Sequence, residues 1–182
     1  MRELLSTVMS TGILALSSNK RLTMLTVSAA ALAFIIIDAS RESRGFFSEV
    51  FDKYSELYNI DKSLLRAIAK VESNFNPNAV NLNPDNPATA KNEGSRDIGL
   101  MQINEKTAVA LGVSDNLYSP TVSIETACKL IVSLKKELGD KLSLLTLISA
   151  YNIGAPRVKR DGIINVSYTS KVYYYHTLYS LA

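Results

Sequence analysis

Cysteine and histidine are nearly absent from this 182-residue sequence, which contains only Cys128 and His176. A single cysteine excludes an intramolecular disulfide, and one histidine without a CxxC or HExxH pattern does not make a conventional zinc site. A glycine-rich loop of the nucleotide-binding type is also missing. We therefore predict no metal and no cofactor. Cys128 is expected to be buried, and His176, with no evident acidic partner in the sequence, is expected to be packed or on the surface rather than catalytic.

Blocks of like charge are missing as well. The formal net charge is +3 and the sequence pI is about 8.9. A mild positive excess without a run of lysine and arginine is not typical of nucleic-acid-binding proteins, so we expect no nucleic-acid partner. Apolar residues make up 47% of the chain and charged residues 20%, which is ordinary for a globular domain with a substantial core.

A long, mostly apolar run without charge is present at residues 22–37, directly after Lys20 and Arg21, and an earlier apolar stretch covers residues 4–16. As a helix the sixteen residues of the 22–37 run span roughly 24 Å, slightly less than the ~30 Å hydrocarbon core of a bilayer. Because no well-placed small-residue cleavage site accompanies it, an uncleaved membrane anchor is favoured over a cleaved secretory signal, and a buried helix is a further alternative. Lys20 and Arg21 would then stay cytoplasmic and the remainder of the chain would be exported.

Alternating strand patterns are nearly absent from the rest of the chain, and helical spacing of apolar residues prevails, which predicts an all-α or α-rich domain. Asp61, Asn104 and Ser119 have the character of N-caps. The expected helices occupy residues 46–58, 62–73, 105–111, 120–138, 142–153 and 167–180. Residues 76–97 are rich in asparagine and proline and predict a long loop. The predicted organisation is an N-terminal anchor or signal at 1–40, a linker and leading helix at 41–58, and a domain at 59–182.

Glu72 is unusual within the expected helix at 62–73. On a helical wheel it falls between Ile68 and Leu65, inside the apolar stripe. It also lies in the last turn, where the negative end of the helix dipole and desolvation both disfavour a charged carboxylate. Both effects raise the pKa of Glu72 toward the value that a general acid needs near neutral pH. A snorkelling or ion-paired surface glutamate is the alternative that position alone leaves open.

Three further motifs share the chain with the Glu72-Ser73 pair. They are "GLMQIN" at 99–104, "SAYNIG" at 149–154 and, as a weaker match, "YTSKV" at 168–172. In their order and approximate spacing these motifs resemble the soluble lytic transglycosylase family, whose fold is lysozyme-like. The resemblance covers residues 56–175. It implies a lysozyme-like, α-rich domain that acts on peptidoglycan glycan strands.

The resemblance implies a role for each matching residue. Glu72 matches the catalytic acid and base of the family. The residues that match substrate-binding positions are Ser73, Gly99, Leu100, Met101, Gln102, Tyr151, Asn152 and Tyr168. No metal ligand is implied.

Each of these roles is chemically reasonable. Gly99 would let the backbone approach a flat sugar chain, where a side chain would obstruct it. Gln102 and Asn152 suit sugar hydroxyl and N-acetyl groups, because an amide both donates and accepts hydrogen bonds. Tyr151 and Tyr168 can donate hydrogen bonds to a carboxyl group while keeping its surroundings apolar.

The implied reaction cleaves the β-1,4 bond between N-acetylmuramic acid (MurNAc) and N-acetylglucosamine (GlcNAc). The carboxyl group protonates the glycosidic oxygen, and the N-acetyl group of the substrate stabilises the cationic centre. The same carboxylate then takes the proton of the C6 hydroxyl group, which gives a 1,6-anhydro-MurNAc end without consuming water. One carboxyl group of raised pKa is chemically sufficient for both steps.

Two other activities remain open at this point. Asp85, Glu93 and Asp97 lie in or beside the loop that precedes Gly99. If Asp85 or Asp97 faces Glu72 across about 6.5–9.5 Å, it could activate a water molecule, and the protein would be a hydrolytic muramidase similar to goose-type lysozymes. The other alternative is a non-catalytic, membrane-tethered module that binds the wall polymer.

The resemblance also suggests a setting. Small anchored members of the family are similar to the wall-opening enzymes of secretion and conjugation systems and to virion-associated phage enzymes. The expected locations are therefore the periplasmic face of the inner membrane or a virion membrane, with export if the N-terminal segment is cleaved. The expected partners are the membrane, through residues 22–37, and either an envelope-spanning machine or a virion.

Overall fold

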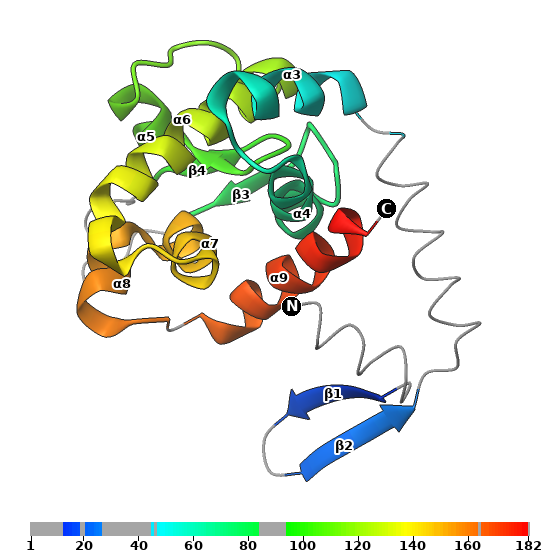
Figure 1. Cartoon of the computed structure of the whole chain (residues 1–182). Coiled ribbons are helices and arrows are strands. Elements are labelled where there is room, and N and C mark those ends of the chain that lie inside the picture. Colours follow the sequence, from blue (N-terminus) through cyan, green and yellow to red (C-terminus); the bar gives the residue numbers. More distant parts are fainter. Residues whose placement is uncertain are drawn as a thin grey trace.

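The computed structural model describes residues 13–18, 21–26, 45, 47–83, 94–163 and 165–181. Helices predominate among them, with a small sheet inserted between the second and third helices of the main body (Figure 1). The helices are α3 (Ser48–Tyr58), α4 (Lys62–Ser73), α5 (Glu105–Ala110), α6 (Pro120–Leu138), α7 (Leu144–Ile153), α8 (Ala155–Asp161) and α9 (Val166–Ser180), with a short 3-10 helix η2 (Gly139–Lys141). The expected helix-rich class is confirmed.

The core forms where five helices meet: α3, α4, α6, α7 and α9. Helix α4 packs most extensively along α9, α3 packs against α6, and α7 contacts α6, α8 and α9. Figure 1 shows α9 running beside α4, although the two helices are far apart in the sequence. The largest fully buried apolar side chains at these contacts are Phe51, Leu65, Ile68, Ile124, Ile131, Leu138, Ile148 and Val172. Cys128 is also fully buried, as predicted.

Helix α4 begins and ends where its sequence dictates. The Asp61 carboxylate accepts a hydrogen bond from the backbone N–H of Ser63 at 2.8 Å, which satisfies a donor that the first turn would leave unpaired. At the other end Asn74 adopts a left-handed conformation with φ of 52° and donates to the carbonyls of Ala69 and Lys70. The expected bounds of this helix and of α6 are confirmed.

Asp61 also contacts His176, near the end of α9, through a 2.7 Å contact between Oδ2 and Nε2. This hydrogen bond is the main reason that the pKa of Asp61 lies below its usual value. The histidine therefore has an acidic partner that its sequence neighbourhood did not indicate. It is a packed residue, as predicted, and it connects the start of α4 to the end of α9.

The expected long loop at 76–97 is partly wrong. It contains β3 (Val80–Leu82) and β4 (Arg96–Ile98), which form an antiparallel sheet with β5 (Ile103–Asn104) in the order β3-β4-β5. Strands of two or three residues are too short to show an alternating pattern, which is why the sequence did not reveal them. Asp85 and Glu93 lie outside the described residues.

The N-terminal segment differs from the predicted helix where the structure describes it. Residues Ile13–Ser18 (β1) and Arg21–Thr26 (β2) pair as antiparallel strands, so the first part of the 22–37 run is extended. Residues 27–37 lie outside the described ranges. Of the helices within those ranges, none combines the length and the apolar character needed to cross a bilayer.

Candidate active site

Glu72 lies in the last turn of α4, on the side that faces α9. Its side chain is half-buried, and its Oε1 accepts a hydrogen bond of 2.6 Å from the hydroxyl group of Tyr168 in the first turn of α9. The packing of α4 against α9 brings the two residues together across 96 positions of sequence. The predicted proximity of Tyr168 to the carboxyl group is therefore observed.

Burial raises the pKa of Glu72 from 4.5 to about 7. Desolvation is the largest cause, because a carboxylate loses hydration when it is surrounded by protein. The negative charge of Asp97 adds a smaller increase, whereas the hydrogen bond from Tyr168 favours the charged form and opposes it. The raised pKa inferred from the helical wheel thus has desolvation as its main source. Near neutral pH the group can both give and take a proton.

Residues 99–102 form a turn that joins three other elements. Ser73 donates a hydrogen bond from Oγ to the Leu100 carbonyl at 2.7 Å, which ties the turn to the end of α4. The Met101 N–H donates to Ser123 Oγ of α6 at 3.0 Å, and the Tyr151 hydroxyl of α7 donates to the Met101 carbonyl at 2.9 Å. The side chains of Leu100 and Met101 are fully buried. Leu100 and Met101 therefore support the site through buried side chains and backbone hydrogen bonds.

Tyr151 was expected to donate to the catalytic carboxyl group, and the structure corrects this expectation. Its hydroxyl group is engaged by the backbone of residue Met101, as described above. Glu72 is nevertheless near enough for its charge to contribute to the raised pKa of Tyr151. The tyrosine thus adds an apolar ring to the surroundings of Glu72, while Tyr168 supplies the hydrogen bond.

Gly99 is required by contacts within the chain. Its φ is +79°, and a Cβ atom at this position would lie 2.1 Å from the carbonyl oxygen of Leu117. The sequence predicted a close approach of the sugar chain to Gly99. Gly99 is instead buried, and what lies close to it is the protein backbone that precedes α6. Beside it, Gln102 donates from Nε2 to the carbonyls of Gly99 at 2.9 Å and Ala79 at 3.1 Å. Its own carbonyl oxygen is the group that it can present to a ligand.

Gly99→Ala is expected to lower the free energy of unfolding by about 2–4 kcal/mol, because the new methyl group meets backbone that cannot move aside. Gly112→Ala is the matched control: Gly112 has a similar φ of +74°, but a Cβ atom there meets nothing within 4 Å. It should lose only about 1 kcal/mol. Urea unfolding of both variants measures the difference. Equal losses would mean that the contact with Leu117 is unimportant.

Glu72 lines a cleft of about 810 Å³ between the small sheet on one side and α7 with α8 on the other. The volume is in the range typical of ligand sites. The lining residues are Glu72, Asn81, Asn83, Asp97, Gln102, Ile103, Asn104, Thr107, Leu130, Leu134, Ala150, Tyr151, Asn152, Ile153, Gly154, Pro156, Arg157 and Arg160. Amide side chains are frequent among them, which suits a ligand rich in hydroxyl and amide groups.

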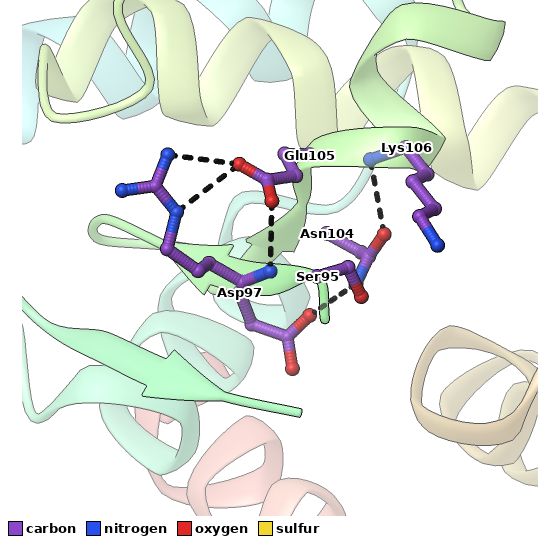
Figure 2. A network of polar contacts seen from close by, with 6 residues as sticks. Ser95, Asp97, Asn104, Glu105 and Lys106 are labelled. Carbon is purple, nitrogen blue, oxygen red and sulfur yellow. Dashed lines mark hydrogen bonds and ion pairs between the residues drawn. The ribbon is translucent and has the colours of Figure 1, made fainter. Parts of the chain in front are cut away.

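Asp97 is the second carboxylate of the cleft. Its Oδ1 accepts a hydrogen bond of 2.8 Å from the side-chain amide of Asn104, which also donates to Ser95 Oγ at 2.9 Å. Figure 2 shows the Asp97 carboxylate turned to the opposite side of the strand from Glu105. The side-chain amide of Asn104 therefore has two roles. Its Nδ2 holds one oxygen of Asp97, and its Oδ1 caps α5 by accepting a hydrogen bond of 3.0 Å from the backbone N–H of Lys106.

The predicted site residues fall into two groups. Glu72, Gln102, Tyr151 and Asn152 line the cleft, and Asn152 is held by a 2.7 Å hydrogen bond that its Oδ1 accepts from Asn165 Nδ2. The predicted residues that are not part of the lining are Ser73, Gly99, Leu100, Met101 and Tyr168. Sequence reasoning missed Asn81, Asn83, Arg157 and Arg160. The three-residue strand and the seven-residue helix that carry most of them gave no periodic signal.

Comparison with known proteins identifies related sequences over most of the chain. Residues 49–172 match the family model described as the transglycosylase SLT domain. The chain is 35% identical over 132 residues to protein IpgF of Shigella flexneri, an alignment that covers 69% of this chain and 78% of the relative. It is 31% identical over 123 residues to invasion protein IagB of Salmonella typhimurium, covering 65% of this chain and 69% of that protein.

Solved structures have the same fold. The structure of the 70 kDa soluble lytic transglycosylase of Escherichia coli matches with a TM-score of 0.56 and 21% sequence identity, covering 73% of this chain and 24% of that one. A lytic transglycosylase Slt of Pseudomonas aeruginosa gives a TM-score of 0.55 at 18% identity. Since the match covers about a quarter of each larger protein, it concerns one domain of those structures.

Proposed function

Because the chain belongs to the transglycosylase SLT family and is a peptidoglycan lytic transglycosylase, we propose that Glu72 is its catalytic acid and base. The observation that carries the proposal is a desolvated carboxyl group in the wall of a cleft, with a pKa raised to about 7 and one oxygen held by Tyr168. A group of this kind can be protonated when substrate binds and ionised after the first proton transfer.

The first step uses the protonated form of Glu72. The proton moves from the carboxyl group to the glycosidic oxygen, and the bond from that oxygen to C1 of MurNAc breaks. The substrate's N-acetyl oxygen shares its electrons with C1 and so stabilises the positive charge. Tyr168 then favours the carboxylate that remains, because its hydroxyl group donates to Glu72 Oε1 at 2.6 Å.

The second step returns Glu72 to its starting state. The carboxylate takes the proton of the C6 hydroxyl group, and the C6 oxygen forms a bond to C1. The products are a GlcNAc end and a 1,6-anhydro-MurNAc end, with no water consumed. Gln102 and Asn152 are proposed to orient the sugars through amide groups that line the cleft. Ser73, Gly99, Leu100 and Met101 are proposed to support the binding surface through the backbone of the 99–102 turn.

Mass analysis of the fragments released from purified cell wall tests this reaction. Anhydro ends, lighter by one water than reducing ends, are the expected product. Reducing ends without anhydro ends would overturn the non-hydrolytic mechanism. The absence of any fragments after treatment with the folded full chain would overturn the enzymatic function itself.

Hydrolysis is a second candidate reaction because of one observation. Asp97 lines the same cleft as Glu72, and its charge contributes to the raised pKa of Glu72. A second carboxylate across the substrate could activate a water molecule. Asp97→Asn separates the two reactions. A hydrolase would lose reducing-end products, whereas a transglycosylase would keep forming anhydro ends, with a modestly lower Glu72 pKa.

Tyr168→Phe is expected to move the alkaline limb of the kcat/KM pH profile upward. The hydrogen bond from Tyr168 lowers the pKa of Glu72, so its removal lets desolvation raise that pKa further. The protonated acid then persists to higher pH. We expect a shift of about one pH unit, together with slower turnover. Tyr151→Phe is the matched control, because its hydroxyl group donates to Met101, and it should leave the limb in place. A downward shift in Tyr168→Phe would contradict the assignment.

The proposed setting is local opening of the cell wall for an envelope-spanning machine. The name of one relative, invasion protein IagB, supports this setting over a virion. Another relative is called a membrane-bound lytic murein transglycosylase F, which supports action close to a membrane.

We propose that the N-terminal segment holds the domain at the periplasmic face of the inner membrane, although strand β2 argues against one continuous helix over 22–37. Copurification with a secretion channel, rather than with virions, would support the proposal, and membrane fractionation tests the attachment.

A further inference from the structure

We propose that Arg157 and Arg160 of α8 form a subsite for the carboxylate groups of the peptide stem that is attached to MurNAc. This inference rests on the proposed function, because it concerns the same cleft. Both arginines line that cleft together with Glu72. They are three positions apart on one helix, which places them on the same face of α8. Pro156, on the same helix, also lines the cleft and continues this wall toward Asn152.

The charges in the cleft point to an anionic part of the ligand. Among the described lining residues the charged side chains are Glu72, Asp97, Arg157 and Arg160. The two carboxylates belong to the end of α4 and to the sheet, whereas both guanidinium groups are on α8. Where a stem peptide is attached, the lactyl carboxyl group of MurNAc is part of an amide bond, so the sugar units themselves are uncharged and give no reason for a pair of arginines. The stem peptides of peptidoglycan carry free carboxylates, and a guanidinium group binds a carboxylate through two parallel hydrogen bonds.

Arg157 has donors available for such a ligand. In the described part of the chain, Arg157 pairs with one carboxylate, that of Asp161. The pair is exposed, and Nε of Arg157 lies 3.9 Å from Oδ2 of Asp161. That distance is too long for a hydrogen bond. Arg160 is more firmly held: its Nε and a terminal nitrogen donate to the two oxygens of Asp161 at 2.9 and 2.8 Å. Asp161 thus fixes Arg160 in position and leaves the fork of Arg157 open.

The remaining basic residue of α8 is directed elsewhere. Lys159 donates from Nζ to the carbonyl of Glu137 at the end of α6, and its own carbonyl accepts from Lys141 Nζ at 2.8 Å. These contacts fasten α8 to α6 and to η2. Lys159 is not part of the cleft lining. One face of α8 therefore anchors the helix through Lys159, and another face presents Arg157 and Arg160 to the cleft. Lys159 is therefore a matched charge control for the two arginines.

The test compares two substrates for the full-length protein: cell wall with its stem peptides intact, and glycan strands from which an amidase has removed the stems and whose newly exposed lactyl carboxyl groups have been converted to neutral amides. For Arg157→Ala we expect the ratio of kcat/KM on peptide-bearing to peptide-free substrate to fall about tenfold or more, mainly through KM. Arg160→Ala should lower the same ratio by a smaller factor. Arg157→Lys keeps the charge without the fork and should recover only part of the ratio.

Lys159→Ala and the melting temperatures complete the test. Lys159→Ala should leave the ratio unchanged, and a fall equal to that of Arg157→Ala would overturn the subsite in favour of general charge attraction. Equal losses on both substrates in Arg157→Ala, or an unchanged ratio, would also overturn it. If Arg157→Ala melts early, Arg157→Lys carries the decision, and full recovery of the ratio would overturn the bidentate contact. Inactivity of the unmodified protein on both substrates would instead contradict the proposed function.

Discussion

Glu72→Gln is expected to reduce the release of anhydro-muropeptides by at least about 10³-fold, because general acid and general base catalysis each contribute about 10²–10⁴ and one carboxyl group serves both steps. Glutamine keeps the shape of the side chain and can still accept the hydrogen bond from Tyr168. Binding of the substrate should therefore persist while turnover is lost. The measurement is chromatography of the fragments released from purified cell wall.

The control for this variant is Glu105→Gln. Glu105 is a glutamate of α5 that pairs with Arg96 and lies outside the cleft lining, so its loss should leave fragment release close to that of the unmodified protein. If Glu72→Gln cleared the wall as fast as the control, Glu72 would not be the acid. The non-catalytic wall-binding alternative predicts no release from any variant.

Glu72→Gln is also expected to be more stable than the unmodified protein by about 3 kcal/mol at about pH 8, a gain absent at about pH 4. The native pKa of Glu72 is raised from 4.5 to about 7, so between these values the folded state binds more protons than the unfolded state. The stability that this group contributes is fully present below the unfolded pKa and is lost as pH rises through the folded pKa. Glutamine does not titrate and escapes this loss.

Urea unfolding of both proteins across this pH range measures the gain. All other ionisable groups are common to the two proteins, so the difference in free energy of unfolding isolates Glu72. It should grow between about pH 4.5 and 7 and then level off. A difference that does not change with pH would mean that the carboxyl group has an ordinary pKa in the folded protein. Gain of stability with loss of activity is the pattern expected when a functional group is held in surroundings that disfavour it.

Much of this site could be predicted because its signals are local. The apolar stripe around Glu72 and the caps at Asp61 and Asn104 depend on residues within two turns of each other, and the structure confirms them. The resemblance to the family motifs then predicted that Tyr168, which is distant in the sequence, lies near Glu72. Its hydrogen bond to Glu72 spans 96 positions, a contact that helical spacing alone could not indicate.

The parts that could not be predicted depend on tertiary contacts. Arginine is usually a surface residue, yet Arg66 is almost fully buried. Its guanidinium group lies 5.2 Å from the ring centre of Phe51 and 5.7 Å from that of Phe75. The pairing of His176 with Asp61 is equally non-local.

The "GLMQ" motif is a further example. The resemblance implied sugar contacts for it, whereas Leu100 and Met101 are buried and join α4, α6 and α7 through backbone hydrogen bonds. A fixed motif can therefore reflect the support of a site as well as contact with substrate.

The pKa of Glu72 is the property on which the proposed chemistry depends, and it can be measured directly. Carbon-13 NMR of glutamate side-chain carboxyl groups, compared between the unmodified protein and Glu72→Gln, identifies the signal of this residue and follows its titration. We predict a midpoint of about 7 for that signal, moved further upward in Tyr168→Phe. A midpoint near 4.5, the ordinary value for glutamate, would contradict the assignment of Glu72 as the group that donates and then recovers the proton.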